Sequence, residues 1–189
     1  MDVTKAIHER RAVRNFSDAE VRPGVVRDLL RAAVQAPSAM NLQPWAFAVF
    51  HGRPRLWDYS ERAKAHLLAV AEPGFIYDPQ IDMYLNASAN LFHGADTLVV
   101  ICSRPGRFHP EEDCCLAAEN LMLAAWGQGL GSCPIGFARP WFNLPETKRE
   151  LGIPREYHVI MPIVLGYPAG PVPGVPREEP EIAAWRWDE

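Results

Sequence analysis

The order of apolar and polar residues predicts a chain in which helices alternate with a few short strands. Apolar residues recur every three to four positions in several stretches, which is the period of one helix face. These stretches predict helices over residues 3–11, from 23 to just before Pro37, and over 53–70, 81–92, 111–126 and 144–151. Shorter apolar runs predict strands over residues 46–50, 97–102 and 159–165. Three strands separated by helices indicate a layered α/β or α+β domain, with too few strands for a complete doubly wound sheet.

The predicted elements differ in how deeply they should be buried. The strand over 97–102 is an unbroken apolar run, so we expect it to be buried on both faces of a sheet. Pro162 lacks a backbone N–H and should place the last strand at a sheet edge or at a bulge. The helix over 111–126 is apolar nearly all round and should be covered by protein on most sides.

Composition and charge narrow the class of protein. The chain of 189 residues is long enough for one domain with a sizeable core, and its 48% apolar content is ordinary for a soluble protein. A formal net charge of −4 argues against nucleic acid or an anionic membrane as the main partner. No apolar run approaches the ~18–20 residues of a membrane-spanning helix, and the amino terminus lacks a signal-peptide hydrophobic region, so we expect a cytoplasmic protein. The cysteines and histidines lack metal-ligand spacing, so we expect buried thiols and no metal site.

The carboxyl-terminal segment differs from the rest of the chain. It holds five prolines, Pro168, Pro171, Pro173, Pro176 and Pro180. Such a semi-extended tail cannot form a core of its own, yet it carries Trp185 and Trp187. We therefore expect one domain over residues 1–167 and a tail over 168–189 that packs on a second subunit.

Two segments near the amino terminus carry candidate chemistry. The first is Arg10-Arg11-Ala12-Val13-Arg14-Asn15-Phe16, and the second is Ala36-Pro37-Ser38-Ala39-Met40-Asn41-Leu42-Gln43-Pro44-Trp45. Three clustered arginines can hold a phosphate and leave a cation for a second negative group, although a solvated helix end would look similar. The second segment offers small residues, backbone N–H groups and an amide to a flat heterocycle, or it is an ordinary turn. Together they indicate a phosphorylated ring cofactor.

A glycine-rich segment follows the helix predicted over 111–126. It reads Gly127-Gln128-Gly129-Leu130-Gly131-Ser132-Cys133-Pro134-Ile135-Gly136-Phe137. Its G-x-G pattern does not indicate a Rossmann fold, because that motif follows a strand and opens a helix. The segment either simply ends the helix or brings backbone close to a flat ring.

Taken in chain order, these segments resemble the signatures of the FMN-dependent nitroreductase family. Residues 10–16 resemble the family's R-R-S-x-R-x-F, and residues 36–45 resemble its A-P-S-x-x-N-x-Q-P-W. Residues 118–125 with 129–132 resemble its central helix and G-L-G-S segment. Leu165-Gly166-Tyr167-Pro168 resembles the L-G-Y-P that ends its last strand, and Pro176-Arg177 resembles the basic residue of its tail.

The resemblance implies a fold and a set of cofactor contacts. The implied fold is an α+β, three-layer sandwich with a central mixed, mostly antiparallel sheet, in an intertwined homodimer that binds FMN tightly at its interface. Arg10, Arg11 and the Ala12 backbone, with Arg177, would hold the phosphate, and Arg14 would meet the pyrimidine edge. The remaining implied contacts are Pro134, Ile135 and Gly136 beside flavin N5, and Pro37, Ser38, Ala39, Met40 and Asn41, some of them from the opposite protomer.

The chain departs from the family pattern at two positions. Ala12 stands where the family usually has Ser, so only its backbone can contribute. No acidic residue precedes Gly136, which leaves the contacts at that ring edge open. The resemblance also implies an asparagine near the flavin, for which Asn86 and Asn90 are both candidates.

The implied activity is that of an NAD(P)H-dependent FMN oxidoreductase. Hydride would pass from NADH or NADPH to flavin N5 and then, in a ping-pong cycle, to a small aromatic acceptor such as a nitroarene or quinone. The flavin carries out the redox chemistry, so no catalytic side chain is expected. Phe75, Tyr77 and Tyr84 would line the acceptor slot, unless they are ordinary core residues. The alternatives are another flavin reaction on the same scaffold, namely metabolite dehydrogenation or reductive dehalogenation, and a non-catalytic FMN-binding protein.

Overall fold

The structure is a computed structural model that describes residues 2–71, 89–106 and 108–187. Four strands form one sheet in the order β1-β2-β4-β3, and all neighbours are antiparallel. The strands are β1 (Trp45–His51), β2 (Thr97–Ser103), β3 (Gly131–Pro134) and β4 (His158–Gly166). The helices are α1 (Val3–Glu9), α2 (Pro23–Ala33), α3 (Arg53–Val70), α6 (Pro110–Gly127), α7 (Arg139–Phe142) and α8 (Pro145–Leu151), with 3₁₀ turns η1 (Ala39–Asn41) and η2 (Gly136–Ala138).

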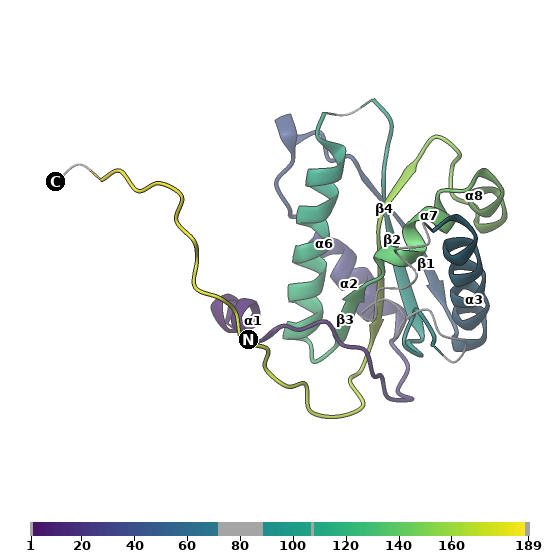
Figure 1. Ribbon diagram of the computed structural model, residues 1–189, viewed down its shortest axis with the longest axis horizontal. Helices are drawn as coiled ribbons and strands as arrows, with labels where there is room; N and C mark the ends of the chain where they lie inside the picture. Colours follow the sequence, from purple (N-terminus) through teal and green to yellow (C-terminus); the bar gives the residue numbers. More distant parts are fainter. Residues whose placement is uncertain (1, 72–88, 107, 188–189) are drawn as a thin grey trace.

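Helices cover both faces of the sheet, which gives three layers (Figure 1). The central strand β2 needs cover on both faces, because all seven of its residues are buried. Leu98 and Val100 belong to the core cluster formed with α3 and α7. Val99 and Ile101 belong to the cluster formed with α2 and α6. The predicted burial of this strand on both faces and the predicted sandwich are therefore confirmed.

Pro162 lies in a central strand, so the prediction of an edge strand is wrong; β4 does contain a bulge, but at Ile160, while Pro162 itself stays paired in register with Val100. Strand β4 pairs with β2 on one side and β3 on the other, and its register against β2 shifts next to Ile101. The carbonyl of Pro162 accepts a hydrogen bond from the N–H of Ile135 at 2.8 Å. Strand β3 ends at Pro134. Pro162 therefore lies just beyond the end of β3, where its lack of a backbone N–H removes no hydrogen bond from the β3–β4 ladder.

Several predicted boundaries differ from the structure. Strand β3 and helix α7 were not predicted, because each is only four residues long. Of the predicted helix over 81–92, residues 81–88 lie outside the described residues, and residues 91–94 form a turn. The first helix ends at Glu9 and not at 11, which leaves residues 10–16 extended.

Helix α6 is covered on one side only within this chain. It packs against α2 and the sheet, but Cys115 is exposed and Leu116 is 45% exposed. The expectation that protein covers most sides of this helix is therefore not met by a single chain. No helix in the described ranges is long and apolar enough to cross a bilayer.

After β4 the carboxyl-terminal tail first lies against residues 12–16, and its last part then extends away from the body of the molecule (Figure 1). It has no helix or strand up to residue 187. Trp185 and Trp187 stack on each other with ring centroids 5.9 Å apart, yet they are 70% and 76% exposed. The tail therefore presents large aromatic surface that its own chain does not cover.

Candidate functional site

The basic segment 10–16 lies across the ends of strands β3 and β4. Ala12 forms a parallel bridge with Ser132, and the N–H of Val13 donates to the Ser132 carbonyl at 2.9 Å. A Cβ on Gly131 would come within 2.6 Å of Val13, and one on Gly166 within 2.7 Å of the Phe16 ring. Both glycines are needed because only a residue without a side chain lets the segment approach this closely.

Arg14 lines a cavity of about 240 Å³ that we call the Arg14 cavity. Its walls are Arg14, Leu91, His93, Cys133, Pro134, Ile135, Gly136 and Phe137. Four of these residues are predicted site residues from two distant parts of the sequence: Arg14, Pro134, Ile135 and Gly136. A cation and a turn of close-lying backbone therefore border the same space.

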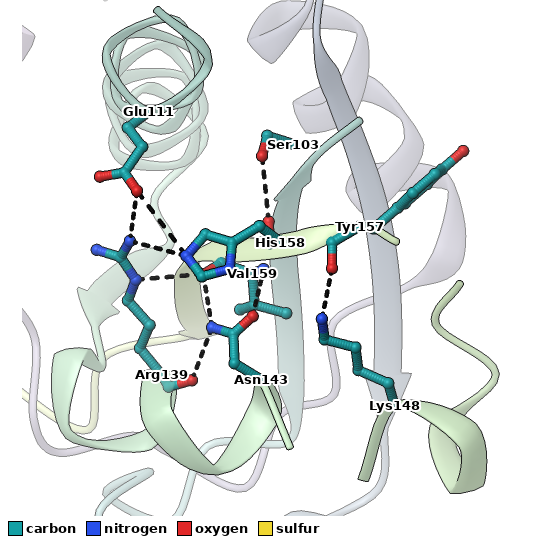
Figure 2. Close-up of polar contacts among 8 residues, drawn as sticks. All are labelled: Ser103, Glu111, Arg139, Asn143, Lys148, Tyr157, His158 and Val159. Carbon is teal, nitrogen blue, oxygen red and sulfur yellow. Dashed lines mark hydrogen bonds and ion pairs between the residues drawn. The ribbon is translucent and has the colours of Figure 1, made fainter. Parts of the chain in front are cut away.

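Polar contacts fix the wall that contains Pro134 to Phe137. The Ile135 N–H is bonded to β4, as described above, and Arg139 follows immediately after η2. Figure 2 shows the Arg139 guanidinium between Glu111 of α6, at 3.0 Å, and the Val159 carbonyl of β4, at 3.2 Å. Asn143 donates to that same carbonyl at 3.0 Å. These contacts hold the cavity wall to both α6 and β4.

The imidazole of His158 lies in the same cluster. Arg139 is 3.3 Å from its Nε2 atom, and Glu111 is 3.8 Å away. Burial, and then the charge of Arg139, lower the pKa of His158 below its usual value. A neutral imidazole at this position leaves the Arg139–Glu111 ion pair undisturbed near neutral pH.

A second cavity, of about 250 Å³, lies between the basic segment and the start of the tail. Residues 12–15 line one side, and Pro168 and residues 170–173 line the other. The tail is held there because the N–H of Ala169 donates to the Asn15 carbonyl at 3.1 Å. Arg14 borders both cavities.

The other predicted phosphate-binding cations lie around this region. Arg10 is paired with Glu119 of α6 at 3.2 Å. Arg11 donates through one terminal nitrogen to the carbonyls of His8 and Arg10, both at 2.7 Å, and its other terminal nitrogen lies 3.5 Å from the Val175 carbonyl of the tail. The Nε atom of Arg11 is buried and has no hydrogen-bond partner in the described part of the chain. Arg177 is exposed and bonds only to carbonyls of the tail among the described residues.

The predicted segment 37–41 forms a strained turn at the other end of helix α6. Met40, Asn41 and Gln43 all have left-handed backbone, with φ of 49°, 54° and 46°. The Asp113 carboxylate, in the first turn of α6, accepts a hydrogen bond from the Ala39 N–H at 3.1 Å. The Ser38 hydroxyl accepts one from the Gln43 N–H at 3.0 Å. Such strain persists only where surrounding contacts enforce it, and it is common at binding sites.

The structure does not bring the two halves of the predicted site together within one chain. Residues 10–16 lie near the carboxyl end of α6, and the turn with η1 lies near its amino end (Figure 1). The helix rise of ~1.5 Å per residue separates Asp113 from Gly127 by about 21 Å. Met40 is 72% exposed and points away from its own core.

The remaining predicted residues divide into two groups. Asn90 is described, and its side chain accepts hydrogen bonds from the N–H groups of Phe92, at 2.9 Å, and Gly94, at 3.4 Å. It therefore shapes the turn that leads into the Arg14 cavity. Phe75, Tyr77, Tyr84 and Asn86 lie outside the described residues.

Sequence reasoning missed Leu91 and His93 of the cavity wall, whereas Cys133 and Phe137 lie within the glycine-rich segment 127–137 but were not singled out as site residues. Burial, and then the charge of Arg14, lower the pKa of His93 to about 4. Burial raises the pKa of the Cys133 thiol, so this group is also uncharged near neutral pH. No motif marks His93, and the only sequence signal is a His-Gly pair placed just before the buried strand β2.

The chain is similar to proteins of one known family. Residues 7–167 match the model of the Nitroreductase family. A relative from Archaeoglobus fulgidus, with the provisional name NADH dehydrogenase/NAD(P)H nitroreductase, is 32% identical over 169 residues, which are 87% of this chain and 84% of the relative. An iodotyrosine deiodinase from Thermotoga neapolitana is 26% identical over 186 residues, which are 90% of this chain and 91% of the relative.

A solved structure gives the same result for the fold. The crystal structure of a nitroreductase with bound FMN from Bacteroides fragilis superimposes with a TM-score of 0.80 at 25% identity, and all of both chains is covered. The predicted family and fold class are thus confirmed, and the chain belongs to the nitroreductase family.

Proposed function

We propose that this chain is an FMN-dependent oxidoreductase that accepts hydride from NADH or NADPH and reduces a small flat acceptor. The observation that carries the proposal is the Arg14 cavity, where a fixed cation and the Pro134–Gly136 backbone border one space. The FMN of the Bacteroides fragilis structure and the printed names of the relatives support the same cofactor and donor. Bound FMN would supply hydride acceptance and donation at its ring.

The residues of this chain fit such a cofactor. The buried Nε atom of Arg11 is a donor that needs an acceptor, and a phosphate oxygen would meet that need. Arg10, Arg11, the Ala12 backbone and Arg177 would hold the phosphate. Arg14 would face the pyrimidine edge, where a fixed cation favours the negative charge that reduction brings. Pro134, Ile135 and Gly136 would position the ring through backbone.

We further propose that a second copy of the chain completes each site. The turn over residues 37–41 is held at the amino end of α6, whereas the Arg14 cavity lies beside β3, which follows the carboxyl end of that helix, so the partner's turn would supply these contacts. The half-exposed α6 and the two exposed tryptophans of the tail provide apolar surface for such a dimer. In a two-fold dimer, each chain would give one half to each of two sites.

The acceptor is proposed from sequence alone. Phe75, Tyr77 and Tyr84 are candidates to line an aromatic slot for a nitroarene or quinone, and replacement of Phe75 or Tyr77 by Ala should change the ratio of kcat/KM between acceptors. An unchanged ratio would remove them from the slot.

The test of the cofactor and donor is an anaerobic absorption spectrum. The purified protein, loaded with FMN, should show flavin bands at about one FMN per chain, and NADH or NADPH should bleach them. Flavin that neither nucleotide bleaches would contradict the oxidoreductase proposal and favour a binding role. Failure to bind added FMN would contradict the site assignment itself.

The phosphate contacts can be tested separately. Arg11→Gln should weaken FMN binding by about 10- to 100-fold, because a charge-assisted hydrogen bond is lost. Riboflavin, which lacks the phosphate, should bind both proteins equally. Arg31→Gln, which alters an exposed arginine of α2, is the matched control and should leave both affinities unchanged. Equal loss of riboflavin and FMN affinity would place Arg11 outside the phosphate contacts.

Reductive dehalogenation is the second candidate, because the Thermotoga neapolitana relative is named an iodotyrosine deiodinase. The two candidates differ in their acceptors. Oxidation of the reduced protein by an iodophenol, with release of iodide and no reaction with nitroarenes, would favour dehalogenation.

A further inference from the structure

His93 is held at the wall of the Arg14 cavity by the turn over residues 90–94. The Asn90 side chain caps this turn, and the Ser60 hydroxyl accepts a hydrogen bond from the Leu91 N–H at 2.7 Å. The backbone of His93 is left-handed, with φ of 55°. The imidazole thus reaches the cavity from a fixed turn, while Arg14 comes from the basic segment and Cys133 from β3.

Three side chains of the cavity wall are ionisable: Arg14, Cys133 and His93. Arg14 is a permanent cation. The Cys133 thiol is uncharged near neutral pH because of burial. The pKa of His93, lowered to about 4 by burial and Arg14, leaves that imidazole neutral as well. The cavity wall therefore carries one fixed positive charge and one group that can respond to a change of charge.

We propose that His93 contacts the flavin beside Arg14 and takes up a proton when the flavin is reduced. This inference rests on the proposed function. A hydride brings two electrons and one proton to the ring, and it leaves the ring with one negative charge. One proton from solvent then binds to the imidazole, so that the net charge of the site does not change. When hydride passes to the acceptor, the ring loses its charge and the imidazole releases its proton to solvent.

The direction of this response follows from electrostatics. A negative charge close to an imidazole stabilises the protonated form, and the effect is strong where water is partly excluded. Arg14 favours the same negative charge but cannot change its own protonation. His93 is therefore the group in the described wall that couples proton uptake to reduction near neutral pH.

The direct test counts protons in the FMN-loaded protein. Wild type, His93→Asn and the control His109→Asn are reduced anaerobically with NADH or NADPH in weak buffer at about pH 7.5, with a pH indicator. Asn tolerates left-handed backbone and cannot take up the proton. His109 also has left-handed backbone, with φ of 46°, but its side chain is 71% exposed at the start of α6.

Wild type and His109→Asn should bind about one proton from solvent for each FMN reduced, and His93→Asn should bind close to none. Equal proton uptake by wild type and His93→Asn would overturn the inference. The proposed function would survive that result, because FMN would still be bound and bleached. A wild type that binds no FMN would overturn both.

A second measurement uses wild-type protein and so does not depend on how the variant folds. Imidazole resonances of isotope-labelled histidine are followed in the oxidised and reduced protein, and the His93 signal is assigned by its absence from His93→Asn or His93→Gln. The His93 signal should change from the neutral to the protonated form on reduction. A His93 signal that stays neutral in reduced protein would overturn the inference.

Discussion

Gly131 is the residue that lets the basic segment lie flat against the sheet. A Cβ at this position would meet all three carbon atoms of the Val13 side chain beyond Cα at 2.6–2.8 Å. Neither Val13 nor Gly131 has room to move, because both are buried. Arg14 follows Val13 directly, so a shift here would also move the cation of the cavity wall.

Gly131→Ala should therefore destabilise the fold by about 1–3 kcal/mol, as overpacking does, and should weaken FMN binding. Gly24→Ala is the matched control, because nothing lies within 4 Å of a Cβ at Gly24 in helix α2. The control should gain about 0.5–1 kcal/mol from the higher helix propensity of Ala. Denaturant unfolding and FMN fluorescence titration measure the two effects, and an unaltered Gly131→Ala protein would contradict the close packing.

The lowered pKa of His93 predicts a pH dependence of stability in the cofactor-free protein. The unfolded chain, with an ordinary histidine pKa of about 6.5, binds a proton more readily than the folded one. Above about pH 6.5 His93 is neutral in both states and does not change the free energy of unfolding. That free energy falls as pH decreases from 6.5 toward 4, by less than the ~3 kcal/mol that full burial would give, because water still reaches part of the imidazole. Unfolding of wild type and His93→Asn between these pH values measures the difference, and parallel curves would contradict the burial of a neutral imidazole.

At the scale of residues, the sequence predicted the candidates that belong to motifs and missed those that do not. Arg14 and the Pro134–Gly136 segment could be found because clustered cations and close-lying backbone leave compositional patterns. His93 could not, because a lone histidine in a turn has no pattern and reaches the cavity only through tertiary contacts. The role of all these residues in flavin binding stays a prediction.

Helix α6 connects the elements that carry the two halves of the site. Near its start, Asp113 holds the turn with η1 and Glu111 holds Arg139. Farther along, Glu119 pairs with Arg10. The helix therefore contacts both halves, although neither its apolar pattern nor its resemblance to the family's central helix predicted these polar contacts.

Asp113→Ala should loosen the turn over residues 37–43. The buried carboxylate is the acceptor for the Ala39 N–H, and its loss leaves that donor unpaired at a cost of about 1–3 kcal/mol. Hydrogen exchange of the Ala39 amide should accelerate by about 10- to 100-fold. Glu112→Ala changes the exposed neighbouring carboxylate and is the control. Equal exchange in both variants would show that Asp113 does not hold the turn.

Sequence patterns predicted long elements better than short ones, for a physical reason. Helix α3 was predicted with its observed bounds, because eighteen residues give several turns of helical spacing. Strand β3 has four residues, Gly-Ser-Cys-Pro, without a strand pattern. It exists because its backbone pairs with β4 and with Ala12, and such long-range pairing is not encoded locally.

At the scale of the whole molecule, a single chain leaves apolar surface uncovered and the two halves of the proposed site apart. The outer side of α6 and the tail expose apolar side chains, and the two halves of the proposed site lie toward opposite ends of α6. A two-fold dimer would cover this apolar surface and would bring the two halves of the site together. The fold of a single chain explains neither the exposed apolar surface nor the separation of the two halves.

Replacement of both tail tryptophans, Trp185→Ala with Trp187→Ala, should weaken the proposed dimer. Large aromatic side chains carry much of the binding free energy at interfaces, and the dissociation constant should rise by more than about 10-fold. Trp57→Ala, at an exposed tryptophan of α3, is the control and should leave the dissociation constant unchanged. Sedimentation equilibrium measures both, and a dimer unaffected by the double change would remove the tail from the interface.

The most direct test of the shared site uses two defective chains in one dimer. Arg14→Glu should disable the half of the site that contains the Arg14 cavity. Asn41→Glu places a carboxylate in the other half, the turn over residues 37–41. Chains with different affinity tags are expressed together, the mixed dimer is purified, and bound FMN is counted by absorbance. Each variant alone should bind no FMN. The mixed dimer should bind about one FMN for each pair of chains, because one of its two sites combines an intact Arg14 half with an intact turn. A mixed dimer without FMN would contradict the account, since that is the result expected if each chain built its site alone.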